Sequence, residues 1–326
     1  MTIRWLLAAL LLLGVLSVPL VTAAQRPGKT PRIGYLTPIA QPSREEHFRR
    51  ALRQLGYTEG RSIHVEYRSA EGRFERLPAL ATELVALDVD VIVAVVTQAA
   101  LAAKAATGSV PIVMLAVADP VGVGLVASLA RPGGNVTGTS SVAADVVGKQ
   151  LELLRDVLPA VTRVAALWNP ANVTFQQRQL AEAKAAAAKL RMQLHPVEAP
   201  TAADLDRAFA TIVDLRPDGL IVLGDPLFFP LNARIGALAI SHRLPTVSGS
   251  REFAEGGGLV AYGPSYFEAY RGAAGYVDRI LKGVRPGDLP VEQTTTFELV
   301  VNARTARTLG VTIPAPVLAR ADHVIQ

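Results

Sequence analysis

The sequence of 326 residues contains no cysteine. This absence excludes disulfide bonds, thiol nucleophiles and thiolate metal ligands. A chain of this length buries enough apolar surface to fold on its hydrophobic core, so it needs no disulfides even in an oxidising compartment. It also lacks the thiol by which an exported protein would carry a lipid anchor. We therefore expect a freely diffusing protein.

Positive and negative charges are nearly balanced in the sequence. Charged residues make up 19% of the chain, and the formal net charge is +5 at pH 7. The densest basic stretch, residues 44–53, also contains Glu45 and Glu46. A nucleic-acid-binding protein concentrates its lysines and arginines in a patch or stripe. We therefore expect no nucleic-acid partner.

Signatures of catalysis, metals and cofactors are missing from the sequence. It has no G-x-S-x-G and no H-E-x-x-H motif, and its histidines are far apart: His47, His64, His195, His242 and His323. The string G-V-G-L-V-A at residues 122–127 is close to a dinucleotide fingerprint. However, Asp119 and Pro120 precede it, and the carboxylate would repel a pyrophosphate at a helix start. We expect no cofactor, no metal and no enzymatic activity.

Long apolar runs are confined to the first residues. Arg4 is followed by an apolar run over residues 5–21 and then by small residues up to Ala24. This order is typical of a secretory signal peptide. A membrane anchor is the alternative, because the run approaches the length that spans a bilayer. Pro19 and the small residues favour cleavage near Ala24, so we expect a signal peptide over residues 1–24 and a periplasmic protein.

From Arg32 onward, short β-branched runs alternate with stretches rich in alanine and leucine. This pattern predicts an α/β fold with parallel sheets covered by helices on both faces. In the first half we expect strands at residues 33–36, 63–67, 91–96 and 112–117, and helices at 43–55, 74–87 and 98–106. Ser43 and Glu46 have the spacing of a capping box for the first helix, and Gly56 would end it.

A second series has the same pattern. After a strand at 136–140, it comprises strands at residues 163–168, 194–197, 220–223 and 246–248, and helices at 176–190, 202–215 and 231–242. A strand at 259–262, a helix at 266–282, a strand at 297–301 and a helix at 303–309 follow. We therefore expect two Rossmann-like, doubly wound lobes, joined by more than one segment as in a hinge. The predicted lobes comprise residues 31–141 plus 265–293 and residues 142–264 plus 294–326.

In open parallel sheets, ligands bind beyond the carboxyl ends of the strands, so the loops after the strands hold the candidate site. These loops of both lobes would face one cleft. The candidate ligand-binding residues in them are Thr37, Thr97, Gln98, Asp119, Ser140, Ser141, Asn169, Asp225, Phe228 and Tyr262.

Two of these loops are near-copies, A-D-P-V at residues 118–121 and G-D-P-L at 224–227. Asp119 or Asp225 would hold the ammonium group of a ligand. The alternative is that each aspartate only caps a helix whose first residue is proline. Aromatic residues make up only 6% of the chain. Phe228 and Tyr262 are the aromatic candidates, with core packing as the alternative for each.

Several phrases of the sequence resemble the ABC transporter substrate-binding protein family related to tryptophan and tyrosine uptake proteins. The most specific are R-P-G-G-N-V-T-G at residues 131–138 and R-E-F-A-E-G-G at 251–257, and the resemblance covers residues 31–326. It implies a type I periplasmic-binding fold, in which two lobes on a three-segment hinge close on a ligand. It also implies docking to a membrane permease driven by an ATPase, and an aromatic amino acid or similar compound as cargo.

We therefore expect a monomeric solute-binding subunit of an ABC importer. The alternative is a periplasmic ligand sensor that passes its bound state to a membrane partner. A repressor of this architecture would carry a helix-turn-helix before the first lobe, where this chain has the predicted export signal. The sequence leaves the identity of the ligand open.

Overall fold

The computed structural model describes residues 29–326. The predicted signal peptide, residues 1–24, lies outside the described residues. In the described part of the chain, no helix is both long enough and apolar enough to cross a bilayer.

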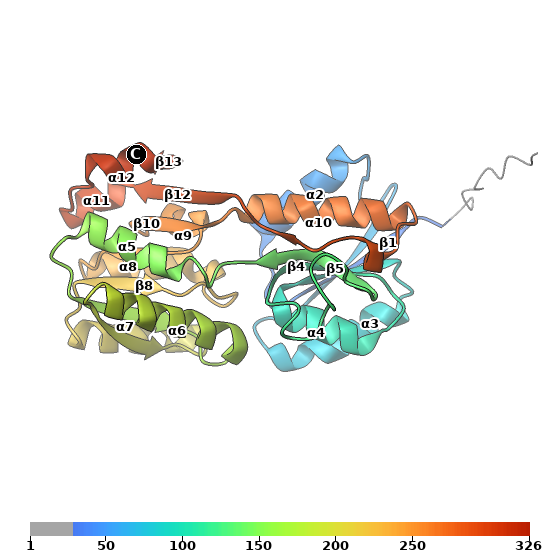
Figure 1. The fold of residues 1–326 in the computed structure, drawn as a ribbon, viewed down its shortest axis with the longest axis horizontal. Helices are drawn as coiled ribbons and strands as arrows, with labels where there is room; N and C mark the ends of the chain where they lie inside the picture. Colours follow the sequence, from blue (N-terminus) through green and yellow to red (C-terminus); the bar gives the residue numbers. More distant parts are fainter. Residues whose placement is uncertain (1–28) are drawn as a thin grey trace, which may run out of the picture. The chain divides into compact units, whose positions relative to one another are not determined.

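The first lobe lies on the right in Figure 1. It is built on a six-stranded sheet with the strand order β11-β5-β4-β3-β1-β2. All of its strand pairs are parallel. Its strands are β1 (Arg32–Thr37), β2 (His64–Ser69), β3 (Val91–Val95), β4 (Ile112–Ala118), β5 (Val136–Ser141) and β11 (Glu292–Gln293).

The second lobe is built on a seven-stranded sheet with the order β13-β12-β10-β9-β8-β6-β7. Only the pairing of β10 with β12 is antiparallel in this sheet. Its strands are β6 (Arg163–Trp168), β7 (Gln193–Glu198), β8 (Gly219–Val222), β9 (Thr246–Ser248), β10 (Val260–Pro264), β12 (Phe297–Asn302) and β13 (His323–Ile325).

Helices cover both faces of each sheet. They are α2 (Pro42–Gln54), α3 (Leu77–Ala86), α4 (Val96–Ala106), α5 (Val147–Val157), α6 (Val173–Lys189), α7 (Leu205–Asp214), α8 (Asn232–Ser241), α9 (Arg251–Glu255), α10 (Tyr266–Leu281), α11 (Ala303–Leu309) and α12 (Ala315–Arg320). Short 3-10 helices are η1 (Phe74–Arg76), η2 (Ala202–Asp204), η3 (Phe229–Leu231) and η4 (Pro286–Asp288).

Strand β3 shows why both faces of its sheet need covering. All five of its residues are buried. Ile92 and Ala94 join the apolar cluster that includes residues of α3 and α4. Val91, Val93 and Val95 join the cluster on α2 and α10. Side chains alternate between the faces of a strand, so an apolar run of this kind is stable only between two helix layers. The predicted doubly wound fold is confirmed.

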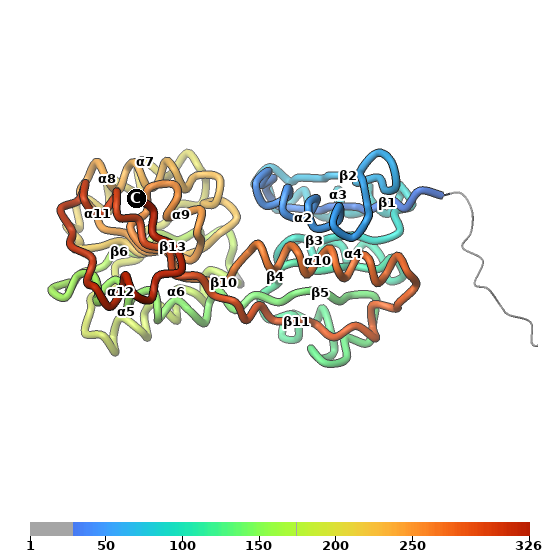
Figure 2. The backbone as a smooth tube through the Cα atoms, turned by 90° about the horizontal axis from the view of Figure 1, so that it is seen from above, coloured from blue at the N-terminus to red at the C-terminus, as the bar shows by residue number. Residues whose placement is uncertain are grey.

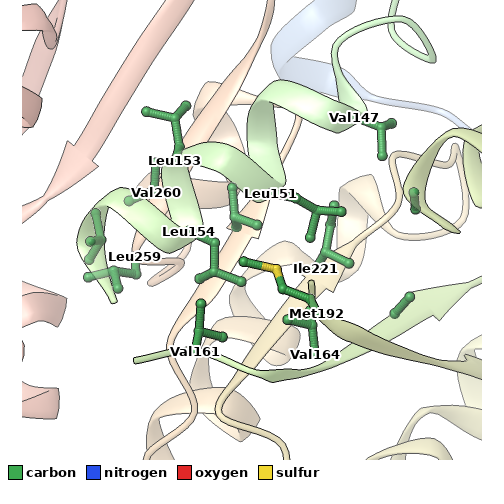
Figure 3. Close-up of a cluster of buried hydrophobic side chains, with 14 of the residues drawn as sticks. Val147, Leu151, Leu153, Leu154, Val161, Val164, Met192, Ile221, Leu259 and Val260 are labelled. Carbon is green, nitrogen blue, oxygen red and sulfur yellow. The ribbon is translucent and has the colours of Figure 1, made fainter. Parts of the chain in front are cut away.

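The second sheet is covered in the same way. On one face, Leu151 and Leu154 of α5 belong to a buried apolar cluster with Ile221 of β8 and Val260 of β10 (Figure 3). On the other face, Phe209 of α7 and Ile235 of α8 cluster around Leu220 and other residues of the same sheet. Each sheet therefore has its own two-sided hydrophobic core.

The chain passes between the two sheets after β5, between β10 and α10, and again between β11 and β12 (Figure 2). Helix α10 packs on α2 and on strands of the first sheet. A multi-segment connection of this kind restricts relative motion to bending at a few positions. The residue boundaries of the lobes stay a prediction, because residues 31–326 form a single compact unit.

The predicted capping box of the first helix is wrong. Helix α2 begins at Pro42, with Gln41 as its N-cap and no side-chain cap, so Ser43 already lies in the first turn. Proline is favoured at the first helical position because it has no N–H to leave unpaired. Gly56 follows the C-cap with a φ of 91°, as expected for the residue that ends the helix. The sequence analysis also missed α5, α9, α12, β11 and β13.

A β-bulge distorts the first sheet between Met114 and Val117 of β4. The bulged Ala116 has a φ of 55°, and its N–H donates to Oγ1 of Thr139 at 3.1 Å. Opposite the bulge, Gly138 has a φ of 130°, and a Cβ there would lie 2.0 Å from the carbonyl oxygen of Met114. Glycine is therefore required at this position by both conformation and space.

We expect Gly138→Ala to lower the free energy of unfolding by roughly 1–3 kcal/mol, because alanine would be strained and would push β4 away. Gly134→Ala is the matched control, since a Cβ at Gly134 meets nothing within 4 Å. Urea unfolding curves compare the two variants with the parent. Equal midpoints for all three proteins would contradict the assignment.

Candidate functional site

A cavity lies where strand-end loops of the first lobe meet those of the second. The cavity is narrow, because the space in it that a water molecule can occupy is about 30 Å³. Its lining residues are Gln41, Arg44, Val95, Val96, Thr97, Gln98, Leu115, Ala116, Ala118, Ser141, Asn172, Phe175, Gly224, Pro226, Phe229, Tyr266 and Tyr270.

Four helices begin at this cavity. The first turns or N-caps of α2, α4, α6 and α10 contribute lining residues, among them Arg44, Thr97, Asn172 and Tyr266. The N-cap side chain makes no capping hydrogen bond in any of these four helices, although at α2 the N-cap N–H donates to the carboxylate of Glu45 at 2.9 Å. The first N–H groups of a helix have no partner within the helix, and its N-terminus carries partial positive charge. The cavity is therefore suited to a ligand with a carboxylate or another anionic group.

Two lining residues have a backbone conformation that non-glycine residues rarely adopt. Val96, the first residue of α4, has a φ of 60°, and Ala116 in the bulge of β4 has a φ of 55°. A positive φ is most costly for a β-branched residue such as valine. Strain of this kind is characteristic of functional sites, where the surrounding structure holds it in place. At Val96 it allows α4 to begin directly at the end of β3, beside the cavity.

Arg44 on α2 joins the two lobes. Its guanidinium carbon lies 3.8 Å from the ring centre of Tyr266 and 3.9 Å from that of Phe229. Nε donates to Oε1 of Glu252 at 2.8 Å, and Nη2 donates to Oε2 at 3.3 Å. Phe229 and Glu252 belong to the second lobe, and Tyr266 begins α10. This cation–π and bidentate contact, here called the Arg44 clamp, therefore links the two lobes beside the cavity.

The attraction between Arg44 and Glu252 in the Arg44 clamp favours the ionised form of both side chains. Arg44 is only 3% exposed. Burial opposes ionisation of both side chains, but the opposite charges are close enough to overcome it. Arg44 holds the pKa of Glu252 below its ordinary value, and Glu252 raises the pKa of Arg44. The pair is therefore ionised at neutral pH.

A buried polar network supports the second-lobe side of the cavity. Asp225 is fully buried and accepts hydrogen bonds from the side-chain amides of Asn169 at 2.9 Å and Asn172 at 2.7 Å. It also accepts from the backbone N–H of Leu227 at 2.9 Å. Burial raises the pKa of Asp225, against the effect of these hydrogen bonds. Asn172 then accepts from Nε2 of Gln98 on α4, so the network reaches the first lobe.

Three of the predicted site residues line the cavity: Thr97, Gln98 and Ser141. Oγ1 of Thr97 accepts from the N–H of Ala118, and Oγ of Ser141 accepts from the N–H of Ala143, both at 3.1 Å. Both hydroxyl groups keep a proton that they can donate.

The other predicted residues are not among the lining residues. Thr37 donates to the carbonyl of Ile39 at the end of β1. Asp119 is exposed and accepts from the N–H of Gly122, so it caps a turn. Ser140 is buried in β5. Asn169 and Asp225 hold each other in the network.

Two aromatic residues lie in hydrophobic clusters. Phe228 is buried in the second lobe, and its neighbour Phe229 lines the cavity in its place. Consecutive residues of a tight turn point in different directions, and the sequence could not tell which of the two faces the ligand side. Tyr262 packs on the apolar cluster of α5, with its ring centre 6.0 Å from that of Phe297.

Sequence reasoning missed several lining residues. The polar and aromatic ones are Gln41, Arg44, Asn172, Phe175, Tyr266 and Tyr270. They lie in the N-cap or first turns of helices, a few residues after the positions that directly follow the strands. Extending the search from strand ends into the first helical turns would have found them. Among the described residues, no three His, Asp or Glu side chains are grouped as a metal site would require.

We expect the Arg44 clamp to couple the lobes energetically. In a double-mutant cycle of Arg44→Met and Glu252→Gln, urea unfolding should give a coupling energy of about 1–3 kcal/mol. The matched control is the Arg53 and Glu46 pair on α2, whose side chains are 49% and 41% exposed. Exposed pairs contribute little, so Arg53→Met with Glu46→Gln should show a much smaller coupling. Equal coupling energies in the two cycles would contradict the expectation that the Arg44 clamp couples the lobes.

For Asp225, we expect a structural role in the free protein. Asp225→Asn replaces one acceptor oxygen by a donor that would face the amide of Asn169 or Asn172. This should reduce the stability of the ligand-free protein by about 1–3 kcal/mol. Asp119→Asn is the control, because asparagine can still accept from Gly122. If thermal unfolding of Asp225→Asn matches that of the parent while ligand binding is lost, Asp225 contacts the ligand.

The chain is similar to known binding proteins over most of its length. The "Tyrosine-binding protein" of Clostridioides difficile strain R20291 is 28% identical over 318 residues, covering 92% of this chain and 91% of that protein. The structure of an ABC domain from Streptococcus pneumonia in complex with L-Trp is 27% identical, with a TM-score of 0.81, covering 91% of this chain and all of that one.

A more distant structure shares the fold. The solute binding protein of a 5-methylthioribose transporter from Thermotoga lettingae is 14% identical, with a TM-score of 0.61, covering 90% of this chain and 93% of that one. The fold is that of the type I periplasmic-binding proteins. A family model described as "ABC transporter substrate binding protein" matches residues 32–325. The chain therefore belongs to the family of ABC transporter substrate binding proteins, which are binding proteins and not enzymes.

Proposed function

We propose that this protein captures an amino acid, of aromatic or similar type, in the cavity between its lobes and delivers it to an ABC importer. The observation that carries this proposal is the convergence of four helix N-termini on the cavity. The hydroxyl groups of Thr97 and Ser141 lie among them. Together they supply hydrogen-bond donors and positive potential for a ligand carboxylate.

The ligand class draws support from the relatives and from the walls of the cavity. One relative is named for binding tyrosine, and the structure of another contains L-Trp. In this chain, Phe175, Phe229, Tyr266 and Tyr270 line the cavity together with small apolar residues. Aromatic rings provide the contact area that an aromatic or large apolar side chain needs. The proposed binding residues are Thr97, Gln98 and Ser141, with Arg44, Asn172, Phe229 and Tyr266.

The proposed setting is the periplasm, after removal of residues 1–24, with the protein as a monomer. Its partners there are a membrane permease and the ATPase that drives it, as the family implies. We propose no catalytic role. Ligand capture would proceed by hinge closure about the connecting segments, because closure buries a small molecule and presents a changed surface to the permease. The Arg44 clamp and the contact between Gln98 and Asn172 would hold the closed form.

A thermal-shift panel of the twenty standard L-amino acids, with sugars and short peptides as controls, tests this function. We expect L-tyrosine or L-tryptophan to raise the unfolding temperature, since a ligand that binds only the folded state stabilises it. Small-angle X-ray scattering should then show a smaller radius of gyration with that amino acid bound. Stabilisation by a sugar alone would contradict the amino acid proposal, and an unchanged radius at saturation would contradict closure.

A further inference from the structure

Gln41, the N-cap residue of α2, contains a buried acceptor without a partner. Gln41 is 9% exposed, and its Oε1 accepts no hydrogen bond within the described chain. A buried carbonyl oxygen without a partner is costly, and native proteins contain few of them. Other buried side-chain atoms without a partner among the described residues belong to His47, Ser140, Trp168, His195 and Asn232. Of all these residues, Gln41 alone lines the cavity.

Most of the other polar groups considered at this cavity are hydrogen-bond donors, or acceptors that already have a partner. The helix first turns offer N–H groups, and Thr97 and Ser141 offer hydroxyl protons. Oδ1 of Asn172 already accepts from Gln98. Both oxygens of Asp225 already accept hydrogen bonds from the chain. A ligand that brings a carboxylate to the donors therefore needs a separate acceptor for its own N–H groups.

The charged groups around Gln41 are already paired. Its backbone N–H donates to the carboxylate of Glu45 at 2.9 Å, and Glu45 lies 3.6 Å from Arg49. Arg44 is paired with Glu252. Among the polar side chains on this wall, Gln41 is therefore the one whose acceptor oxygen is both buried and without a partner. Gln41 lies on the first lobe, at the start of α2, whereas Asn172 lies on the second, at the start of α6.

We propose that Oε1 of Gln41 accepts a hydrogen bond from the amino group of the bound ligand and so selects compounds that carry one. This proposal rests on the proposed function, because it assumes an amino acid in the cavity. The carboxylate would lie at the helix N-termini and the amino group at Gln41. Gln41 thereby determines specificity, and its unpaired oxygen in the free protein lowers stability in exchange for recognition.

The test compares each amino acid with its analogue that lacks the amino group. Calorimetric titrations use L-tyrosine with 3-(4-hydroxyphenyl)propionate, and L-tryptophan with indole-3-propionate. We expect the parent protein to bind the amino compound about ten- to a hundredfold more tightly than its analogue, because the analogue lacks a hydrogen bond from a charged group. Gln41→Met keeps the length of the side chain but removes the acceptor. In this variant the ratio of the two affinities should fall to nearly one. Gln41→Leu serves as a second variant if the first does not fold.

The matched control is Asn232→Leu. Asn232 begins α8, is 6% exposed and has an unpartnered Nδ2, but it does not line the cavity. Both substitutions remove an unpartnered buried amide, so neither should lower the unfolding midpoint of the ligand-free protein. Only Gln41→Met should change the amino preference. A preference retained in Gln41→Met would overturn the role of Gln41, whereas failure of the parent protein to bind either amino acid would overturn the proposed ligand class.

Discussion

The site depends on one constraint of parallel sheets, which is that every strand ends at the edge where the next helix begins. At β3 and α4 this connection is as short as it can be, because Val95 ends the strand and Val96 starts the helix. The positive φ of Val96 makes so abrupt a turn possible. Helix α6 of the second lobe begins after a short loop that follows β6, so N–H groups at helix starts of both lobes collect at one cavity.

The buried polar groups near this cavity are of two kinds. Some hydrogen-bond to one another, and others have no partner. Asp225, Asn169 and Asn172 satisfy one another, and Nε2 of Gln176 and of Gln179 both donate to the carbonyl of Gly224 at 2.8 Å. A satisfied network of this kind is rigid and fixes the loop after β8. Oε1 of Gln41 is a buried acceptor at this cavity that remains without a partner, and we propose that the ligand supplies one.

The two lobes contact each other mainly through polar and aromatic side chains. The apolar cores of the two sheets are separate, so few apolar side chains hold the lobes together. The Arg44 clamp instead joins the lobes through an ion pair and through contacts of the guanidinium with aromatic rings. A buried, bidentate guanidinium contact is specific in geometry. It therefore favours one arrangement of the two lobes over many loosely packed ones.

The two doubly wound lobes and the sheet edge that holds the candidate site could be predicted from the sequence alone. Residues 91–95 and 163–168 are apolar enough to be strands only if both faces are covered, and the placement of Thr97, Gln98 and Ser141 follows from the strand ends.

Which side chains beyond those positions face the cavity depends on the tertiary structure. Phe229 and not Phe228 reaches it, because adjacent residues of a turn diverge. Arg44 and Glu252 meet across 208 positions of sequence, and the edge strand β11 forms only by pairing with β5. Local patterns cannot contain such contacts, because each depends on a partner that folding alone brings near.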